Sequence, residues 1–118
     1  MEIIITCSFS GNNFNPKTLL SKGLNLKNII EKGTILSKGR YKNKKSPYSH
    51  AEISSNDLSA LLRLIDENII EIRDAGAEEL IIHADLKYQG QCNWEISKVQ
   101  LKKIAELDIA LTISCFEY

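Results

Sequence analysis

The sequence has few of the residues that usually mark a catalytic or metal site. It contains three cysteines, two histidines and two prolines in 118 residues. The cysteines Cys7, Cys92 and Cys115 lie far apart, and no two of them make a C-x-x-C pair. A serine elbow and a phosphate-binding glycine loop are both missing, and zinc would need three or four converging ligands. The sequence therefore predicts no catalytic residue, no metal site and no cofactor.

Long apolar runs are also missing. No stretch approaches the ~20 apolar residues that a membrane-spanning helix needs. The N-terminal run 3–5 is apolar, but no basic residue precedes it and polar Thr6 follows at once, as in a strand rather than a signal peptide. With an odd number of cysteines as well, we expect reduced thiols and a cytoplasmic protein without membrane contact.

Hydrophobic periodicity predicts one α+β domain over residues 1–118. The expected strands are 3–10, 33–39, 48–54, 79–88 and 109–117. The expected helices are a short one between Asn15 and Gly23, a long one over 57–75 capped by Asn56, and one from Ser97 to Leu107. The order β-α-β-β-α-β-α-β is typical of a two-layer sandwich in which helices cover one mixed sheet. Its first six elements have the ferredoxin-like order, and the last two strands should be parallel.

Charge is the most uneven property of the chain. The formal net charge is zero, yet residues 1–56 hold nine Lys/Arg against three acids, and residues 57–118 hold six against twelve. Such asymmetry concerns partners and association rather than fold. Head-to-tail self-association through the oppositely charged halves is one reading of it.

An acidic face is predicted along the solvent side of the long helix and just beyond it. Its residues are Glu67, Glu71, Asp74, Glu78 and Glu79, and the weaker candidates are Asp66 on the same helix and Asp85 on the following strand. Like charges at i+3 and i+4 spacing each cost a helix ~0.2–0.5 kcal/mol. Asp74 also lies near the helix C-terminus, where the helix dipole disfavours an anion. A partner-binding surface explains this arrangement, and an ordinary solvated helix face is the alternative.

A basic segment supplies a second candidate surface. Its residues are Lys38, Arg40, Tyr41, Lys42, Lys44 and Lys45. The cations could follow a phosphate backbone while the tyrosine stacks on a base. The alternative is a solvated hairpin tip whose lysines discourage edge-to-edge strand pairing. The neutral overall charge argues against a nucleic-acid-binding protein.

The remaining candidates are single residues or pairs. His83 and Asp85 share a strand face and are close enough in sequence to interact. Cys92 and Trp94 lie in a loop, where the tryptophan either covers the core or forms an exposed anchor. Cys7 and Cys115 fall in expected strands and should be small buried side chains rather than a redox pair.

Several short motifs resemble a family of small bacterial domains of unknown function. They are Phe9-x-Gly11-x-x-Phe14-x-Pro16, Leu20 to Leu26, Lys32-Gly33, Ile96-Ser97 to Leu101, Leu107-x-Ile109-Ala110-Leu111-x-Ile113-Ser114, and Tyr118. Members usually carry a tryptophan just after the basic stretch, where this chain has Tyr48 or His50. The family brings no catalytic residues to carry over.

Small proteins of this kind are similar to the immunity proteins encoded beside polymorphic or contact-dependent bacterial toxins. The resemblance implies a non-enzymatic antitoxin that binds and neutralises a cognate toxin domain, such as a nuclease, in the cytoplasm. The acidic face would then contact the toxin. A small nucleic-acid-binding domain that uses the basic segment 38–45 is the alternative.

Overall fold

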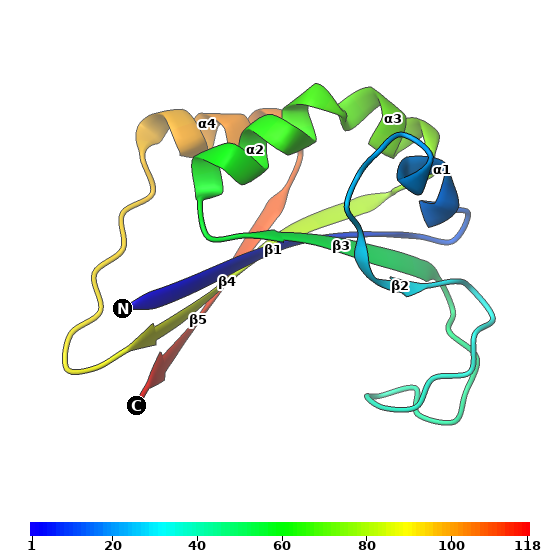
Figure 1. Ribbon diagram of the computed structural model, residues 1–118, viewed down its shortest axis with the longest axis horizontal. Helices are drawn as coiled ribbons and strands as arrows, with labels where there is room; N and C mark the ends of the chain where they lie inside the picture. The colour runs from blue at the N-terminus through cyan, green and yellow to red at the C-terminus, as the bar shows by residue number, and fades with distance from the viewer. The chain divides into compact units, whose positions relative to one another are not determined.

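The chain folds as an α+β protein around one mixed sheet, as the sequence predicts. The computed structural model describes residues 1–118 (Figure 1). The elements are β1 (Glu2–Gly11), α1 (Pro16–Leu20), β2 (Lys27–Ile30), β3 (Ser49–Ser55), α2 (Leu58–Glu67), α3 (Ile69–Asp74), β4 (Glu79–Tyr88), α4 (Lys98–Glu106) and β5 (Ala110–Glu117). The five strands lie in the order β2-β3-β1-β4-β5. Strands β4 and β5 are parallel, which confirms that prediction. None of the helices is long and apolar enough to cross a membrane.

The chain divides into two compact units, which are described in turn. The first unit contains residues 1–7, 54–69 and 80–118, and the second contains residues 8–53 and 70–79. Strands β1, β3 and β4 therefore contribute residues to both units. The single domain expected over residues 1–118 remains a prediction.

In the first unit, helices α2 and α4 pack beside each other on one face of strands β4 and β5 (Figure 1). Leu61 and Ile65 of α2 are buried, as are Ile82 and Ala84 of β4. The 3–4 spacing on the helix and the alternation on the strand place these side chains on facing surfaces. Helix α4 begins with the predicted capping box, in which Ser97 and Gln100 each bind the other's backbone N–H.

The predicted helix over 57–75 is two helices, which differs from the sequence prediction in two ways. The N-cap is Asp57 and not Asn56, because the Asp57 carboxylate accepts from the N–H groups of Ser59 and Ala60. Helix α2 then ends at Asn68, whose φ of −117° and ψ of 12° leave the helical region. The Asn68 side-chain amide donates to the Leu64 carbonyl at 2.8 Å, so the side chain stabilises the helix end.

In the second unit, the end of β1 passes very close to the turn after α3. The Ser10 carbonyl accepts from Glu78 N–H, and the Ala75 carbonyl accepts from Asn15 N–H, each at 2.8 Å. A Cβ atom on Gly11 would lie 2.5 Å from the Gly76 carbonyl oxygen, so only glycine fits. Asn15 then caps α1, and Pro16 is its first residue, both as predicted.

The prediction of a strand between Gly33 and Gly39 is wrong. These residues make only isolated bridges, and the strand that pairs with β3 is the earlier segment Lys27–Ile30. Strand β2 gives no alternating pattern, because three of its four residues are exposed and Asn28 has a positive φ of 50°. Its pairing to β3 is antiparallel, with Lys27 opposite Glu52 and Ile30 opposite His50.

Strand β5 does not show the predicted alternation of buried and exposed residues, and its apolar residues are much less buried than expected. Ile113 is 48% exposed and Cys115 is exposed, whereas Cys7 in β1 is fully buried. The reason is that β5 is an edge strand with a neighbour, β4, on one side alone. The prediction of a buried thiol is therefore confirmed for Cys7 and wrong for Cys115.

Candidate functional site

The second unit carries an acidic segment, which we define as Glu71, Asp74, Glu78 and Glu79. These four residues lie on helix α3 and where the following turn leads into β4. Glu71 is half-buried and the other three side chains are exposed. Glu78 accepts from the Asn12 backbone N–H at 3.1 Å, whereas the other three carboxylates have no cationic partner in the chain. The segment therefore presents negative charge that the protein itself does not neutralise.

The Arg73 side chain stabilises the turn that follows helix α3 by hydrogen bonds to backbone carbonyls. Arg73 donates from Nη1 to the carbonyls of Ala77 and Glu78, each at 3.3 Å. Gly76 allows the turn with a φ of +98°. These contacts fix the backbone that carries Glu78 and Glu79, so their position does not depend on a partner.

The structure does not bring all seven predicted acidic residues together. Asp66 and Glu67 belong to the first unit because the helix is interrupted at Asn68. Asp66 forms an ion pair with Lys103 at 3.3 Å, and this bond is the main cause that raises the pKa of Lys103. Glu67 is exposed and has no ion-pair partner. Asp85 lies on β4 and pairs with His83.

The second unit also carries a basic loop, which we define as residues 38–45. All five of its cationic side chains are exposed, and none forms an ion pair. The guanidinium carbon of Arg40 lies 5.7 Å from the centre of the Tyr41 ring, within the range of a cation–π contact. Leu36 N–H donates to the Lys44 carbonyl, and Asn43 N–H donates to the Leu36 carbonyl, so the backbone of the loop is internally bonded.

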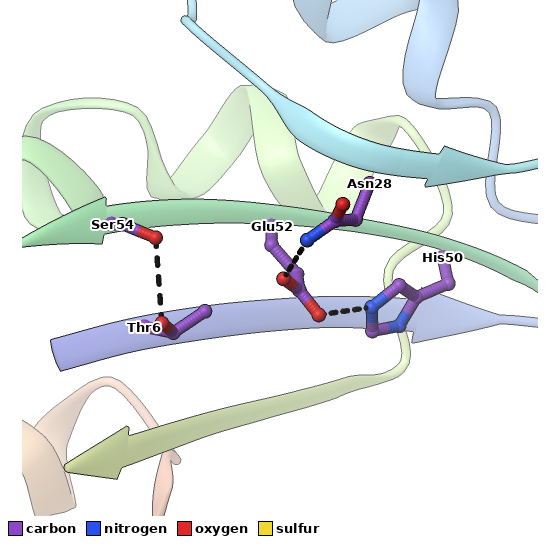
Figure 2. Close-up of polar contacts among 5 residues, drawn as sticks. All are labelled: Thr6, Asn28, His50, Glu52 and Ser54. Carbon is purple, nitrogen blue, oxygen red and sulfur yellow. Dashed lines mark hydrogen bonds and ion pairs between the residues drawn. The ribbon is translucent and has the colours of Figure 1, made fainter. Parts of the chain in front are cut away.

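Both histidines pair with a carboxylate two residues later on the same strand. In the second unit, His50 Nε2 lies 2.8 Å from Glu52 Oε2, and the Asn28 amide donates to Glu52 Oε1 at 2.7 Å (Figure 2). The sequence analysis missed this pair, although His-x-Glu on a strand is the same signal as His83-x-Asp85. Figure 2 also draws the Thr6 and Ser54 hydroxyls of the first unit, 3.4 Å apart.

The predicted His83–Asp85 contact is present in the first unit. His83 Nε2 lies 2.9 Å from Asp85 Oδ1, and its Nδ1 contacts the Thr112 hydroxyl. The ionised carboxylate accepts from Nε2–H, so in the neutral imidazole Nδ1 accepts from the threonine. About four-tenths of each partner's side chain is exposed, as expected for polar pairs on an open strand surface.

A shallow groove of about 250 Å³ lies between α2 and α4 of the first unit. Leu62 and Val99 form its apolar walls, the Asp66–Lys103 ion pair lines it, and Gln100 donates to the Ser59 hydroxyl across it. The histidine pairs do not line this groove. The structure contains no group of three or more His, Cys, Asp or Glu side chains that could hold a metal ion.

Comparison with known proteins gives no relative: no family model, no curated protein and no solved structure matches the chain. Inference about function therefore starts from the charged surfaces. The acidic segment and the basic loop are two groups of neighbouring charged residues, and neither contains an ion pair.

Proposed function

We propose that this chain is a non-enzymatic immunity protein that binds and neutralises a cognate bacterial toxin domain in the cytoplasm through its acidic segment. The observation that carries the proposal is that Glu71, Asp74 and Glu79 have no cationic partner within the chain. Asp74 is the last residue of α3, where the helix dipole disfavours a negative charge. Docking of a cationic partner would remove this cost.

The chemistry of a nuclease toxin fits such a surface. A nuclease holds phosphates with Lys and Arg side chains, and carboxylates at a comparable spacing can occupy the same cationic cleft. Opposite potentials also accelerate encounter and disfavour partners of the wrong sign. Asp66 and Asp85 are weaker contacts in this proposal, because each already has a partner in the chain. Glu67 is exposed without a partner and remains a contact candidate of the first unit.

Co-expression with the toxin tests the proposal. The probe is the C-terminal domain of the protein encoded immediately upstream, expressed in a host that it kills. Wild type should restore growth, whereas the triple variant Glu71→Gln, Asp74→Asn, Glu79→Gln should not. The matched control neutralises three exposed carboxylates elsewhere, Glu2→Gln, Glu95→Gln and Glu117→Gln, and should protect like wild type. Full protection by the acidic-segment variant would contradict the proposal.

A second candidate function is binding of nucleic acid by the basic loop. It is favoured by five exposed cations without an acidic partner and by the contact of Arg40 with the Tyr41 ring. Fluorescence anisotropy with labelled single- and double-stranded DNA should then show binding that weakens steeply between about 50 mM and about 200 mM salt. Neutralising Lys42, Lys44 and Lys45 to Gln should reduce the salt slope. An absence of binding at low salt would exclude this function.

We also infer that the elements from β1 to β4, in which strand β2 replaces the strand expected from the sequence, form a ferredoxin-like, two-layer arrangement. The strand order β4-β1-β3-β2 within the sheet supports this inference. In that arrangement, β5 extends the sheet beyond β4 as an added parallel edge strand.

A further inference from the structure

Strand β5 is an edge strand that lacks the features by which proteins usually protect an edge. It pairs with β4 over its whole length, from Ala110 to Glu117, without a shift in register. It contains no proline, lysine or arginine, and its one charged residue is the last. Ile113 is 48% exposed and Phe116 is 51% exposed, on opposite faces of the strand. A long, apolar and regular edge of this kind can pair with another chain.

The other edge strand, β2 of the second unit, has the protecting features that β5 lacks. It is four residues long, begins with Lys27, and shifts its register against β3 between Lys27 and Ile30. Asn28 has a φ of 50°, which interrupts the extended conformation. Short length, lysine and register irregularities all discourage pairing with a further strand. Of the two edge strands, β5 is therefore the one suited to pairing.

Alternate residues of β5 direct their backbone groups to the open edge. Tyr118 follows β5 directly and donates its N–H to the Tyr88 carbonyl of β4 at 3.0 Å. Successive residues of a strand direct their N–H and C=O groups to alternate sides. The residues of β5 that direct theirs away from β4 are therefore Leu111, Ile113, Cys115 and Glu117. A row of donors and acceptors at this spacing matches the backbone of another extended strand.

The charges at the two ends of β5 determine which strand fits. Asp108 precedes β5 and Glu117 ends it, both are exposed, and neither forms an ion pair. Residues 109–116 between them carry no charge. Antiparallel pairing with a second copy would bring Asp108 of one copy near Glu117 of the other at both ends, and parallel pairing would bring Asp108 near its own counterpart. Like charges at such positions destabilise the pairing, whereas a cation at each end of the incoming strand stabilises it.

We propose that β5 accepts an extended segment of another protein as a sixth strand of the sheet. This segment has an uncharged, apolar centre and a lysine or arginine at each end. Backbone hydrogen bonds along the edge supply the affinity, and contacts with Ile113 and Phe116 select the alternate side chains of the segment. The inference is independent of the proposed function, because it concerns β5 of the first unit and not the acidic segment of the second.

Hydrogen exchange measured by NMR tests the proposal on the full chain. The probe is the end-blocked peptide Lys-Thr-Val-Thr-Ile-Thr-Val-Thr-Val-Lys. At saturation the peptide should slow exchange of the Leu111, Ile113 and Cys115 amides by about tenfold or more, because these N–H groups gain an acceptor. The amides of Thr112 and Ser114 already face β4 and should change little. The same peptide with N-methyl groups on its central residues keeps its side chains but lacks the backbone donors, and it should not bind.

Two variants separate backbone pairing from charge. Ile113→Pro removes an N–H at the open edge, a position where edge strands tolerate proline, and should weaken peptide binding by about tenfold or more. Asp108→Asn with Glu117→Gln should weaken it by about threefold or more at about 20 mM salt. The matched control, Glu2→Gln with Glu95→Gln, should bind like wild type, and circular dichroism checks that each variant is folded.

Three results would overturn the proposal. The first is that the peptide leaves the Leu111, Ile113 and Cys115 amides unprotected. The second is that the N-methylated peptide protects them equally well. The third is that they are already protected in a dimer of the free chain, which would mean that a second copy occupies the edge.

Discussion

Two glycines determine the geometry of the turn that carries the acidic segment. Gly76 has a φ of +98°, and a Cβ atom there would lie 2.5 Å from the Asn13 carbonyl oxygen. A Cβ atom on Gly11 would likewise lie 2.5 Å from the Gly76 carbonyl oxygen. These contacts are backbone against backbone, so no flexible side chain can move away to make room. Two glycines and the Arg73 side chain together therefore position the backbone that carries Glu78 and Glu79.

Replacement of Gly76 by alanine should destabilise the protein strongly. Positive φ alone costs about 1 kcal/mol for alanine, and the backbone clash should bring the loss to about 3 kcal/mol or more. Gly90 is the matched control, because its φ is +79° and a Cβ atom there meets nothing within 4 Å. Urea unfolding should show the larger loss for Gly76→Ala. Equal losses would mean that the close approach is absent.

The buried thiol of Cys7 should make stability depend on pH in the alkaline range. Burial raises its pKa from 9.0 to about 12, so the folded chain holds a proton that the unfolded chain has lost. Stability from this group is complete below about pH 9 and falls by up to about 4 kcal/mol as the pH rises to about 12. Between about pH 8 and about pH 10.5, the free energy of unfolding measured in urea should fall by about 2 kcal/mol less for Cys7→Ala than for wild type. Parallel pH profiles for the two proteins would contradict this.

At the scale of the elements, short side chains at helix ends define α2 and α3. Asp57 caps the start of α2, where its carboxylate accepts hydrogen bonds, and Asn68 caps the end, where its side-chain amide donates one. The interruption assigns Asp66 and Glu67 to the first unit, and Glu71 and Asp74 to the second. The uniform acidic helix face suggested by the i+3 and i+4 spacing is therefore not a feature of one helix.

The identity of the N-cap can be tested by a pair of neighbouring alanine variants. Asp57→Ala should cost about 1 kcal/mol, because it removes the acceptor for the Ser59 and Ala60 N–H groups. Asn56→Ala should cost only a few tenths of a kcal/mol, because Asn56 does not cap the helix. Thermal unfolding of the two variants measures the difference. A larger loss for Asn56→Ala would mean that Asn56 is the N-cap, as the sequence predicts.

The sequence predicts those elements whose signals are local. Pro16 after Asn15, the Ser97–Gln100 capping box and the alternation in β4 need only neighbouring residues, and all three are present. Strand β2 could not be predicted, because its own residues show no strand pattern and its extended conformation depends on pairing with β3.

Contacts between residues that lie far apart in the sequence could not be predicted either. The ion pair of Asp66 with Lys103 depends on the packing of α2 against α4, which the spacing of the two residues in the sequence does not indicate. The candidate acidic residues could thus be identified from the sequence, whereas their division into paired and unpaired carboxylates could not.

At the scale of the whole molecule, opposite charges coexist without cancelling. The basic loop and the acidic segment both belong to the second unit, and the three carboxylates and five cations named above have no ion-pair partners. Surface charges left unpaired in this way stabilise the fold little.

Self-association would be the simplest use of these opposite charges, and we expect it not to occur. Binding of a toxin requires the acidic segment to remain free in the isolated protein. Sedimentation velocity should therefore give a monomer at about 20 mM and at about 300 mM salt, because screening changes nothing when no charged interface is present. A dimer that dissociates as salt rises would instead indicate head-to-tail pairing of the charged surfaces.

The central claim is that Glu71, Asp74 and Glu79 bind a cationic partner. Under the proposed function, the ligand for titration calorimetry is the purified C-terminal domain of the protein encoded immediately upstream, and two variants are compared side by side. Removing these three charges should weaken binding by about tenfold or more, whereas neutralising Lys42, Lys44 and Lys45 should leave the affinity within about twofold of wild type. Unchanged affinity in the folded acidic-segment variant, with a loss in the basic-loop variant, would contradict the account.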